Sequence, residues 1–302
     1  MENIEKELEN YNLIENKPIV LIRESADNKV FSVGQNNKKI LRISKRLPVE
    51  DVKFEYEAIQ YLSEKGIAVP NWIKTKNNNF YITIGGNIAV MFDFLDGYNV
   101  NHLPTQIQAH NAGKGLGLMS NVAPGFKTTS PRKRNIFSEL ERAIRLSDIF
   151  IDQFEGGKEF IDQIEEAIEF AKNQKEIEGL IHNDYRPGNV FFDNNNKVIG
   201  IIDFDWSCMG PIVKDLALAI VEWSFLDGMN KPDFNLFDSF LEGYNSVAIH
   251  KWAKDKKLYS WIKFATLSDA ATYFCDLAGD TGSTKKITGS YMYQKYLFFS
   301  KL

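Results

Sequence analysis

The sequence predicts an α+β fold in two lobes, and three observations support this. Short β-rich runs separated by polar or Gly-Asn segments dominate residues 18–95. After Asp96-Gly97 the apolar residues recur at helical spacing over long stretches. A chain of 302 residues with 44% apolar composition can bury two modest cores. We therefore expect an N-terminal lobe over 1–96, an antiparallel sheet with one helix, and a larger, mainly helical C-terminal lobe over 97–302.

The first lobe is expected to contain short strands and a single helix. Apolar residues at helical spacing predict the helix over 49–65, and Gly66 with Pro70 marks its end. The polar run 77–79, Asn-Asn-Asn, predicts a hairpin turn between the two strands that flank it. The strands are expected at 19–22, 30–33, 39–43, 72–74, 81–83 and 89–92.

The second lobe is expected to consist of long helices. Gly113, Gly115 and Gly117 lack the preceding strand that a dinucleotide-binding loop needs, so they predict a helix packed closely against a neighbour. The basic run 130–134 is expected to be solvated surface or a helix start, with phosphate or substrate contact as the alternative. The helices are expected at 103–120, 133–152, 156–176, 212–227, 234–249, 252–278 and 288–301.

Charge and composition argue against several kinds of partner. The net charge is −4 and no basic face is obvious, so we expect no nucleic acid partner. The N-terminus lacks the features of a secretory signal, and no later run is long and apolar enough to span a bilayer. We therefore expect no membrane association and a cytoplasmic location. Cys208 and Cys275 are too sparse for a disulfide framework and are expected to fill core space.

Short apolar runs around a polar turn interrupt the helical lobe between residues 181 and 204. The β-rich runs 190–192 and 198–202 are joined by an Asn-rich turn and are expected to pair as a hairpin. If the turn centres on Asn196, Asn189 falls opposite Asp203, and directly opposed side chains lie about 5 Å apart. An amide oxygen and a carboxylate at that separation can share Mg²⁺, which prefers oxygen ligands.

Asp184 lies on the loop just before this predicted hairpin, and Pro187-Gly188 can turn the chain so that its carboxylate reaches the same cleft. There it can accept a proton from an attacking hydroxyl, which is the role that phosphoryl transfer requires of a carboxylate. Asp and Asn also dominate ordinary turns, but the ordered spacing favours catalysis. His182 and Asp215 are instead expected to support the loop backbone.

Two motifs, one from His182 to Asn189 and one from Ile202 to Asp205, together resemble those of the aminoglycoside phosphotransferase and choline kinase family, which is related to protein kinases. Residues 214–217, Lys-Asp-Leu-Ala, resemble the usual continuation, and the run to 222–225 is nearest to homoserine-kinase-like bacterial members. The resemblance covers most of the chain. It implies a two-lobed protein-kinase-like fold, with ATP and Mg²⁺ as cofactors and GTP not excluded. The motifs are His182-x-Asp184-x-x-x-x-Asn189 and Ile202-Asp203-Phe204-Asp205.

The same resemblance implies the nucleotide-binding residues of the first lobe. Arg42 takes the place of the lysine that binds the α- and β-phosphates, as a planar fork instead of a point charge. Its acidic partner is expected to be Glu55, with Glu57 as the alternative. The remaining expected contacts are Asn28 in a nucleotide loop that lacks the protein-kinase glycines, and the backbone of Asp93 and Leu95 against adenine.

Three further aspartates are candidates for the substrate side of the site. Asp269 and Asp276 are seven residues apart, which puts them on one helix face where they can attract a cationic acceptor. An ordinary polar helix face is the alternative. Asp205 is the third candidate, and contact with a second metal or simple ordering of the loop remain open for it.

Together these features predict an ATP-dependent phosphotransferase. Its expected partner is a small, amine-bearing molecule with a hydroxyl acceptor: an aminoglycoside, homoserine or an amino alcohol such as choline. We expect a monomer or a homodimer. The alternative is a catalytically inactive, kinase-like nucleotide-binding protein, which Arg42 and the glycine-poor loop suggest. A protein kinase is disfavoured because no Ala-Pro-Glu segment follows Asp203.

Overall fold

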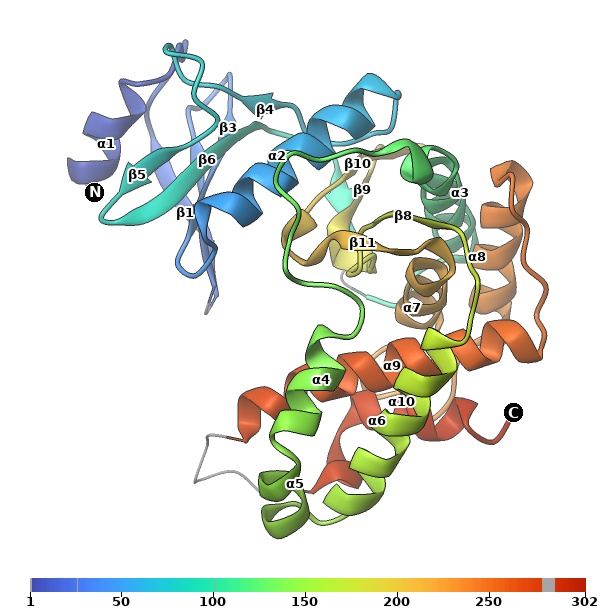
Figure 1. Cartoon of the computed structure of the whole chain (residues 1–302). Coiled ribbons are helices and arrows are strands. Elements are labelled where there is room, and N and C mark those ends of the chain that lie inside the picture. The colour runs from blue at the N-terminus through green and yellow to red at the C-terminus, as the bar shows by residue number, and fades with distance from the viewer. Residues whose placement is uncertain (1, 26, 101, 279–285) are drawn as a thin grey trace. The chain divides into compact units, whose positions relative to one another are not determined.

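A computed structural model of the chain describes residues 2–25, 27–100, 102–278 and 286–302 (Figure 1). Antiparallel sheets and long helices give it the α+β character that the sequence predicts. The chain divides into two compact units. Unit 1 is Met1–Tyr98, Lys127–Arg132 and Phe191–Asp205; unit 2 is Asn99–Phe126, Lys133–Val190 and Trp206–Leu302. The predicted division at residue 97 differs from this in two segments, because 127–132 and 191–205 join unit 1.

Unit 1 contains an antiparallel sheet in the order β1-β2-β3-β6-β4, and β5 also pairs with β6. The predicted hairpin around the run 77–79 is wrong, because both flanking strands pair with β6. β6 is long enough to pair with β4 through Met91 and Phe92 and with β5 through its first residues. The strands are β1 (Ile19–Glu24), β2 (Asn28–Val33), β3 (Lys39–Ser44), β4 (Trp72–Ile73), β5 (Ile82–Ile84) and β6 (Asn87–Asp93).

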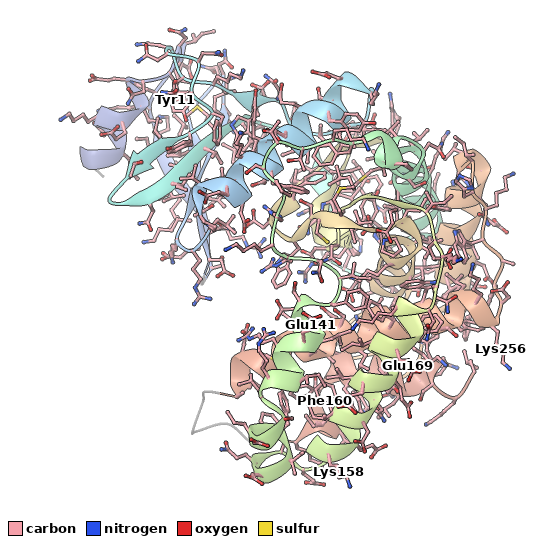
Figure 2. All side chains as sticks on the ribbon, viewed as in Figure 1. Tyr11, Glu141, Lys158, Phe160, Glu169 and Lys256 are labelled. Carbon is pink, nitrogen blue, oxygen red and sulfur yellow. The ribbon has the colours of Figure 1, made fainter. Side chains whose placement is uncertain are left out.

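The helices α1 and α2 pack on different faces of this sheet (Figure 1). Leu41 and Ile43 of β3 belong to the apolar cluster that includes Leu8 of α1 (Glu2–Leu8) and Tyr11, which Figure 2 labels. Because side chains alternate along a strand, Arg42 points to the other face. That face receives α2 (Val49–Glu64), which occupies the predicted helix.

The predicted hairpin forms from β9 (Val190–Phe192) and β10 (Val198–Ile201), in a three-stranded sheet with β7 (Tyr98–Asn99). Asp193 accepts a hydrogen bond from the N–H of Asn196 (2.9 Å) and donates its own N–H to the carbonyl of Lys197 (3.0 Å). The turn therefore centres one residue earlier than predicted. Asn196 has a left-handed backbone, with φ 60°, and takes up the extra residue as a bulge next to the turn.

This register removes the geometric argument that set Asn189 opposite Asp203. β10 ends at Ile201, whose N–H donates to the carbonyl of Ala68 (2.8 Å). Asp203 then follows in a left-handed conformation, with φ 69°, before the 3₁₀ turn Phe204–Trp206. The prediction of directly opposed residues is wrong, because the strand ladder stops before Asp203 is reached.

Unit 2 is mainly helical, with one small antiparallel sheet of β8 (Glu178–Ile181) and β11 (Cys208–Pro211). The helix predicted at 133–152 is split, because Leu146 leaves helical geometry with φ −102° and ψ 14°. The helices are α3 (Gln106–Val122), α4 (Ser138–Arg145), α5 (Ser147–Gln153), α6 (Gly157–Lys172), α7 (Ile212–Ser224), α8 (Phe234–Val247), α9 (Lys256–Leu277) and α10 (Tyr291–Phe299).

The predicted close packing of α3 is confirmed, and α8 is the neighbour. A Cβ atom on Gly113 would lie 2.0 Å from the carbonyl oxygen of Phe240, and one on Gly243 would lie 1.9 Å from that of His110. Real atoms do not approach so closely, so only glycine permits this contact. Elsewhere in unit 2 the core is aromatic: Phe160 of α6, labelled in Figure 2, packs against Phe274 at a ring separation of 5.4 Å.

Two predictions drawn from composition also concern the fold. Cys208 and Cys275 are buried and form no disulfide within the described part of the chain, as expected for residues that fill core space. Among the described residues, no helix is both long enough and apolar enough to cross a membrane.

Candidate active site

Arg42 is the centre of a buried ion cluster in unit 1, which we call the Arg42 cluster: Arg42, Glu55, Asp205 and Asn28. The guanidinium donates from Nη1 to Glu55 Oε1 (2.8 Å) and from Nη2 to Glu55 Oε2 (2.5 Å). A bidentate pair of this kind is among the stronger interactions that arginine makes. The structure therefore pairs Arg42 with Glu55. The alternative partner, Glu57, instead accepts a hydrogen bond from Thr128 (2.6 Å).

Asp205 is the second carboxylate on this arginine. Its Oδ1 accepts from Arg42 Nη1 (2.7 Å) and its Oδ2 from Asn28 Nδ2 (2.7 Å), while Ser44 Oγ donates to the Asn28 oxygen (3.0 Å). Both oxygens of Asp205 are thus held within unit 1. These contacts favour the ordering role for Asp205, and its role as a substrate contact stays a prediction, as does the nucleotide contact of Asn28. Ala26 of the predicted nucleotide loop lies outside the described residues.

The Arg42 cluster leaves one donor unused. Arg42 Nε is buried and, within the described part of the chain, has no hydrogen-bond partner. Buried donors are rarely left unsatisfied, so the site fits a ligand that brings an acceptor oxygen, such as a phosphate. Burial raises the pKa of Glu55, and the adjacent Arg42 opposes that shift.

Arg132 is a residue that the sequence analysis missed. Its side chain is 1% exposed and donates to the backbone carbonyls of Phe204 (3.1 Å) and Asp205 (2.8 Å). A third bond reaches the carbonyl of Asp51 (2.9 Å), so the guanidinium fixes the segment that follows Asp203. The expectation of solvated surface is therefore wrong at this position. No local pattern distinguishes this arginine from its basic neighbours, because its partners are distant backbone atoms.

Residues 182–189 of unit 2, which we call the catalytic loop after their expected role, bring Asp184 and Asn189 together. Asn189 Nδ2 donates to the backbone carbonyl and to Oδ2 of Asp184, each at 2.9 Å. Arg186 Nη2 pairs with Asp184 Oδ1 at 2.7 Å. The carboxylate is held on two sides, by groups that orient it and favour its ionised form.

Two buried residues fix the backbone of this loop, as predicted. Asp215 of α7 accepts from the N–H groups of His182 (2.7 Å) and Asn183 (2.8 Å). His182 is fully buried, and its Nδ1 faces the N–H of Asp184 at 3.3 Å. Burial raises the pKa of Asp215, and the two N–H donors oppose this shift by stabilising the charged form. The loop is therefore pre-organised by α7.

Asn189 and Asp203 have the chemistry that a Mg²⁺ ion requires. Because the Asn189 amide nitrogen faces Asp184, its oxygen is the end that faces away, and oxygen is the atom that Mg²⁺ prefers. Asp203 adopts a left-handed backbone that costs a non-glycine residue free energy, and such residues cluster at functional sites. The donor set fits the ion, and a metal site shared by these two residues stays a prediction.

The predicted adenine-binding segment follows β6. The N–H of Asp93 donates to the carbonyl of Asn71 (2.9 Å), and its carboxylate pairs with Lys39 (2.8 Å). The carbonyl of Leu95 accepts from the N–H of Gly97 (3.1 Å). The N–H of Asp93 is therefore engaged within unit 1, and the adenine contacts of Asp93 and Leu95 stay predictions.

A pocket of about 240 Å³ in unit 2 adjoins the catalytic loop, and Asp184 forms part of its wall. Asp269 and Asp276 of α9 both line it, as expected from their position on one helix face. Asp276 is paired with Arg142 at 2.8 Å. Their roles in substrate binding stay predictions, but both residues line the same pocket as the candidate catalytic residue.

The pocket is also lined by Arg134, from the basic run for which substrate contact was the alternative prediction, and by Lys214, which the sequence analysis missed. Arg134 lies over the ring of Trp206, with its guanidinium carbon 3.9 Å from the ring centroid. Lys214 of α7 is 3% exposed and donates to the side-chain oxygen of Asn183. A lysine inside the apolar run 212–224 is the one signal in the sequence that marks this position.

Comparison with known proteins identifies the family of the chain. Residues 18–254 match the sequence profile of the phosphotransferase enzyme family, a range that contains Arg42, the catalytic loop and Asp203. The chain belongs to this family.

Homoserine kinases are among the relatives of this chain. It is 27% identical over 208 residues to that of Sinorhizobium medicae, covering 67% of this chain and 61% of the relative. It is 29% identical over 231 residues to that of Phenylobacterium zucineum, covering 75% of this chain and 70% of the relative. The chain thus spans 61% of the length of the first of these relatives.

A solved structure supports the fold. The chain superposes on amicoumacin kinase hAmiN, in complex with AMP-PNP, Ca²⁺ and Ami, with a TM-score of 0.77. The match covers 98% of this chain and 92% of the other at 14% sequence identity. This confirms the protein-kinase-like fold predicted for the chain.

Proposed function

We propose that the protein transfers the γ-phosphate of ATP to a hydroxyl of a small, amine-bearing molecule. The observation that carries this proposal is the catalytic loop, in which Arg186 and Asn189 orient Asp184 at the wall of a pocket. Phosphoryl transfer asks for a positioned carboxylate beside the acceptor, and this arrangement supplies one. Kinship with homoserine kinases supports the same reaction.

In this proposal Asp184 receives the proton of the acceptor hydroxyl. The hydroxyl oxygen forms the new bond to the γ-phosphorus as the bond to the leaving ADP oxygen breaks. Arg186 and Asn189 keep the carboxylate oriented, and Asp215 keeps the loop backbone in place. His182 supports the loop and takes no part in proton transfer.

The nucleotide side of the proposed site belongs to unit 1. Arg42, aligned by Glu55, would bind the α- and β-phosphates, and Arg42 Nε is a donor that a phosphate oxygen can satisfy. Asn189 and Asp203 would hold the divalent ion, which we propose to be Mg²⁺. The ion, when bound, neutralises the charge of the phosphates. The backbone of Asp93 and Leu95 would contact adenine, and GTP is the alternative nucleotide.

The acceptor is proposed to be homoserine, an aminoglycoside or an amino alcohol such as choline. Asp269 and Asp276 supply negative charge for its amine. We further propose a cytoplasmic protein, a monomer or a homodimer, that needs no nucleic acid or membrane partner.

Acceptor-dependent ADP release by the purified protein tests the proposal, with Mg-ATP and a panel of these acceptors. We expect stimulation by one acceptor class and a rate at least about a hundredfold lower in Asp184→Asn. Asp238→Asn is the matched control, because this surface aspartate of α8 pairs with Lys254 away from the catalytic loop. Normal binding of Mg-ATP without stimulation by any acceptor would instead indicate the catalytically inactive alternative.

A further inference from the structure

Lys214 is a buried lysine for which the described residues supply no direct counter-ion. Its side chain lines the pocket beside the catalytic loop, and its Nζ donates to the neutral side-chain oxygen of Asn183. An ammonium group has three N–H donors. Over the described ranges of the chain, no carboxylate oxygen lies within 4.0 Å of this nitrogen. Burying a charge is costly unless it is paired, so the site as it stands is electrostatically incomplete.

Two of the three carboxylates that act electrostatically on Lys214 already have other partners. Burial lowers the pKa of Lys214, and Asp215, Asp269 and Asp184 are the carboxylates that oppose this shift. Asp215 accepts the N–H groups of the catalytic loop, and Asp184 is paired with Arg186 at 2.7 Å. Neither can turn to Lys214 without abandoning its own partner.

Asp269 is the anionic counterpart in the same pocket. It lines the pocket from α9, and within the described part of the chain no cationic nitrogen lies within 4.0 Å of its carboxylate. The neighbouring Glu222 is already paired with Lys295. The pocket is therefore lined by a lysine of α7 and an aspartate of α9, and neither has a direct partner of opposite charge among the described residues.

We propose that Lys214 binds an anionic group of the acceptor while Asp269 binds its ammonium, so that the acceptor is a hydroxy amino acid. This rests on the proposed phosphotransfer and selects among its acceptors. An amino alcohol or an aminoglycoside offers an ammonium to Asp269 but leaves Lys214 uncompensated. A carboxylate on the acceptor supplies the missing partner. Lys214 is then a specificity-determining residue.

Matched acceptors test this on the unmodified protein. Homoserine is compared with 3-aminopropan-1-ol, and serine with ethanolamine, since the members of each pair differ by the carboxylate alone. We expect kcat/KM to be about tenfold or more higher for the amino acid, the factor that one hydrogen bond to a charged group supplies. Equal or reversed values, with phosphate still transferred, overturn the inference but leave the proposed function intact. Failure to transfer to any acceptor, with Mg-ATP bound, overturns both.

Variants then assign the preference to Lys214. Lys214→Met keeps the length of the side chain without its charge and should lower kcat/KM for the amino acid about tenfold, while changing that for the amino alcohol little. Asp269→Asn should lower both, because both acceptors carry the amine. Lys158→Met is the control, since Lys158 is exposed on α6 (Figure 2). If folded Lys214→Met lowers kcat/KM equally for both acceptors, the role of Lys214 is structural and the inference is overturned. If that variant does not fold, the matched acceptors still decide.

Discussion

Arg42 pairs with two carboxylates. Glu55 binds it in bidentate fashion, and Asp205 adds a third contact at 2.7 Å. A planar guanidinium can hold both at once, which the point charge of a lysine does less well. Arg42 can therefore bind Glu55 and Asp205 at the same time.

Removing the charge of Asp205 should loosen the Arg42 cluster. Asp205→Asn keeps the shape of the side chain but weakens the contact with Arg42, which is then held by Glu55 alone. We expect the KM for ATP to rise about tenfold, with stability lowered by about 1–3 kcal/mol. Steady-state kinetics and urea unfolding measure the two effects. If the KM for the acceptor rises and that for ATP does not, Asp205 belongs to the substrate side instead.

Asp269 should make kcat/KM for the acceptor depend on pH in the acidic range. Burial raises its pKa above the ordinary value of about 3.9, and Glu222 adds to this, while Lys295, Arg186 and Lys214 oppose it. An ammonium needs the ionised carboxylate, so acceptor binding should weaken as the pH falls through this raised pKa. The folded state favours the protonated form, so this group stabilises the protein at low pH and loses that contribution as the pH rises through the raised pKa.

The pH profile of kcat/KM for the amine-bearing acceptor tests this expectation. The wild-type profile should fall on the acidic side, and Asp269→Asn should show a lower but flatter profile there. If Asp269→Asn shows the same fall on the acidic side as the wild type, another group causes that fall and the role of Asp269 is contradicted.

Sequence spacing predicted those site residues that lie in one continuous motif. Asp184 and Asn189 form a single loop, and the pairing of Arg42 with Glu55 followed from the family resemblance. Lys214 and Arg132 were missed for one reason: their partners come from distant parts of the chain. The sequence shows that a residue is basic but does not show whether it is buried.

The packing of α3 on α8 is the element-scale feature that supports the catalytic loop. Gly113 and Gly243 allow the two backbones to meet. The hydroxyl of Tyr185, the residue after Asp184, donates to the carbonyl of Ala112 in α3 (2.8 Å). A shift of α3 would therefore be transmitted to the loop.

A methyl group at Gly113 should force the two helices apart. In Gly113→Ala the new Cβ meets the backbone carbonyl of Phe240, which cannot move as a flexible side chain would. We expect a loss of about 1–3 kcal/mol in the free energy of unfolding, although alanine favours the helix, together with a lower kcat. Urea unfolding is the measurement, and Lys114→Ala at an exposed position of α3 is the control. A variant as stable as wild type would contradict the packing argument.

Periodicity located most elements but not how they pair. The turn between β9 and β10 is displaced because Asn196 adopts a left-handed backbone, which a run of three asparagines leaves undetermined. β4 and β5 flank a turn, yet both pair with β6, because β6 is long enough to pair with each of them. Register and strand partners depend on tertiary contacts that local patterns do not contain.

At the scale of the whole molecule, the proposed reaction draws on both units. Arg42, Glu55 and Asp203 belong to unit 1, whereas Asp184 and Asn189 belong to unit 2. The order of motifs along the chain was enough to predict the fold class and the family. It was not enough to predict that residues 127–132 and 191–205 join unit 1, because contacts rather than chain order decide the division.

The central claim is transfer of the γ-phosphate to an acceptor hydroxyl, and mass spectrometry of the acceptor measures it directly. The protein is incubated with Mg²⁺, the acceptor and ATP that carries heavy oxygen in its γ-phosphate. We predict an acceptor heavier by one labelled phosphoryl group, formed only with Mg²⁺ present and lost in Asp184→Asn. Label recovered solely as inorganic phosphate, or an acceptor unchanged beside protein saturated with Mg-ATP, would contradict the account.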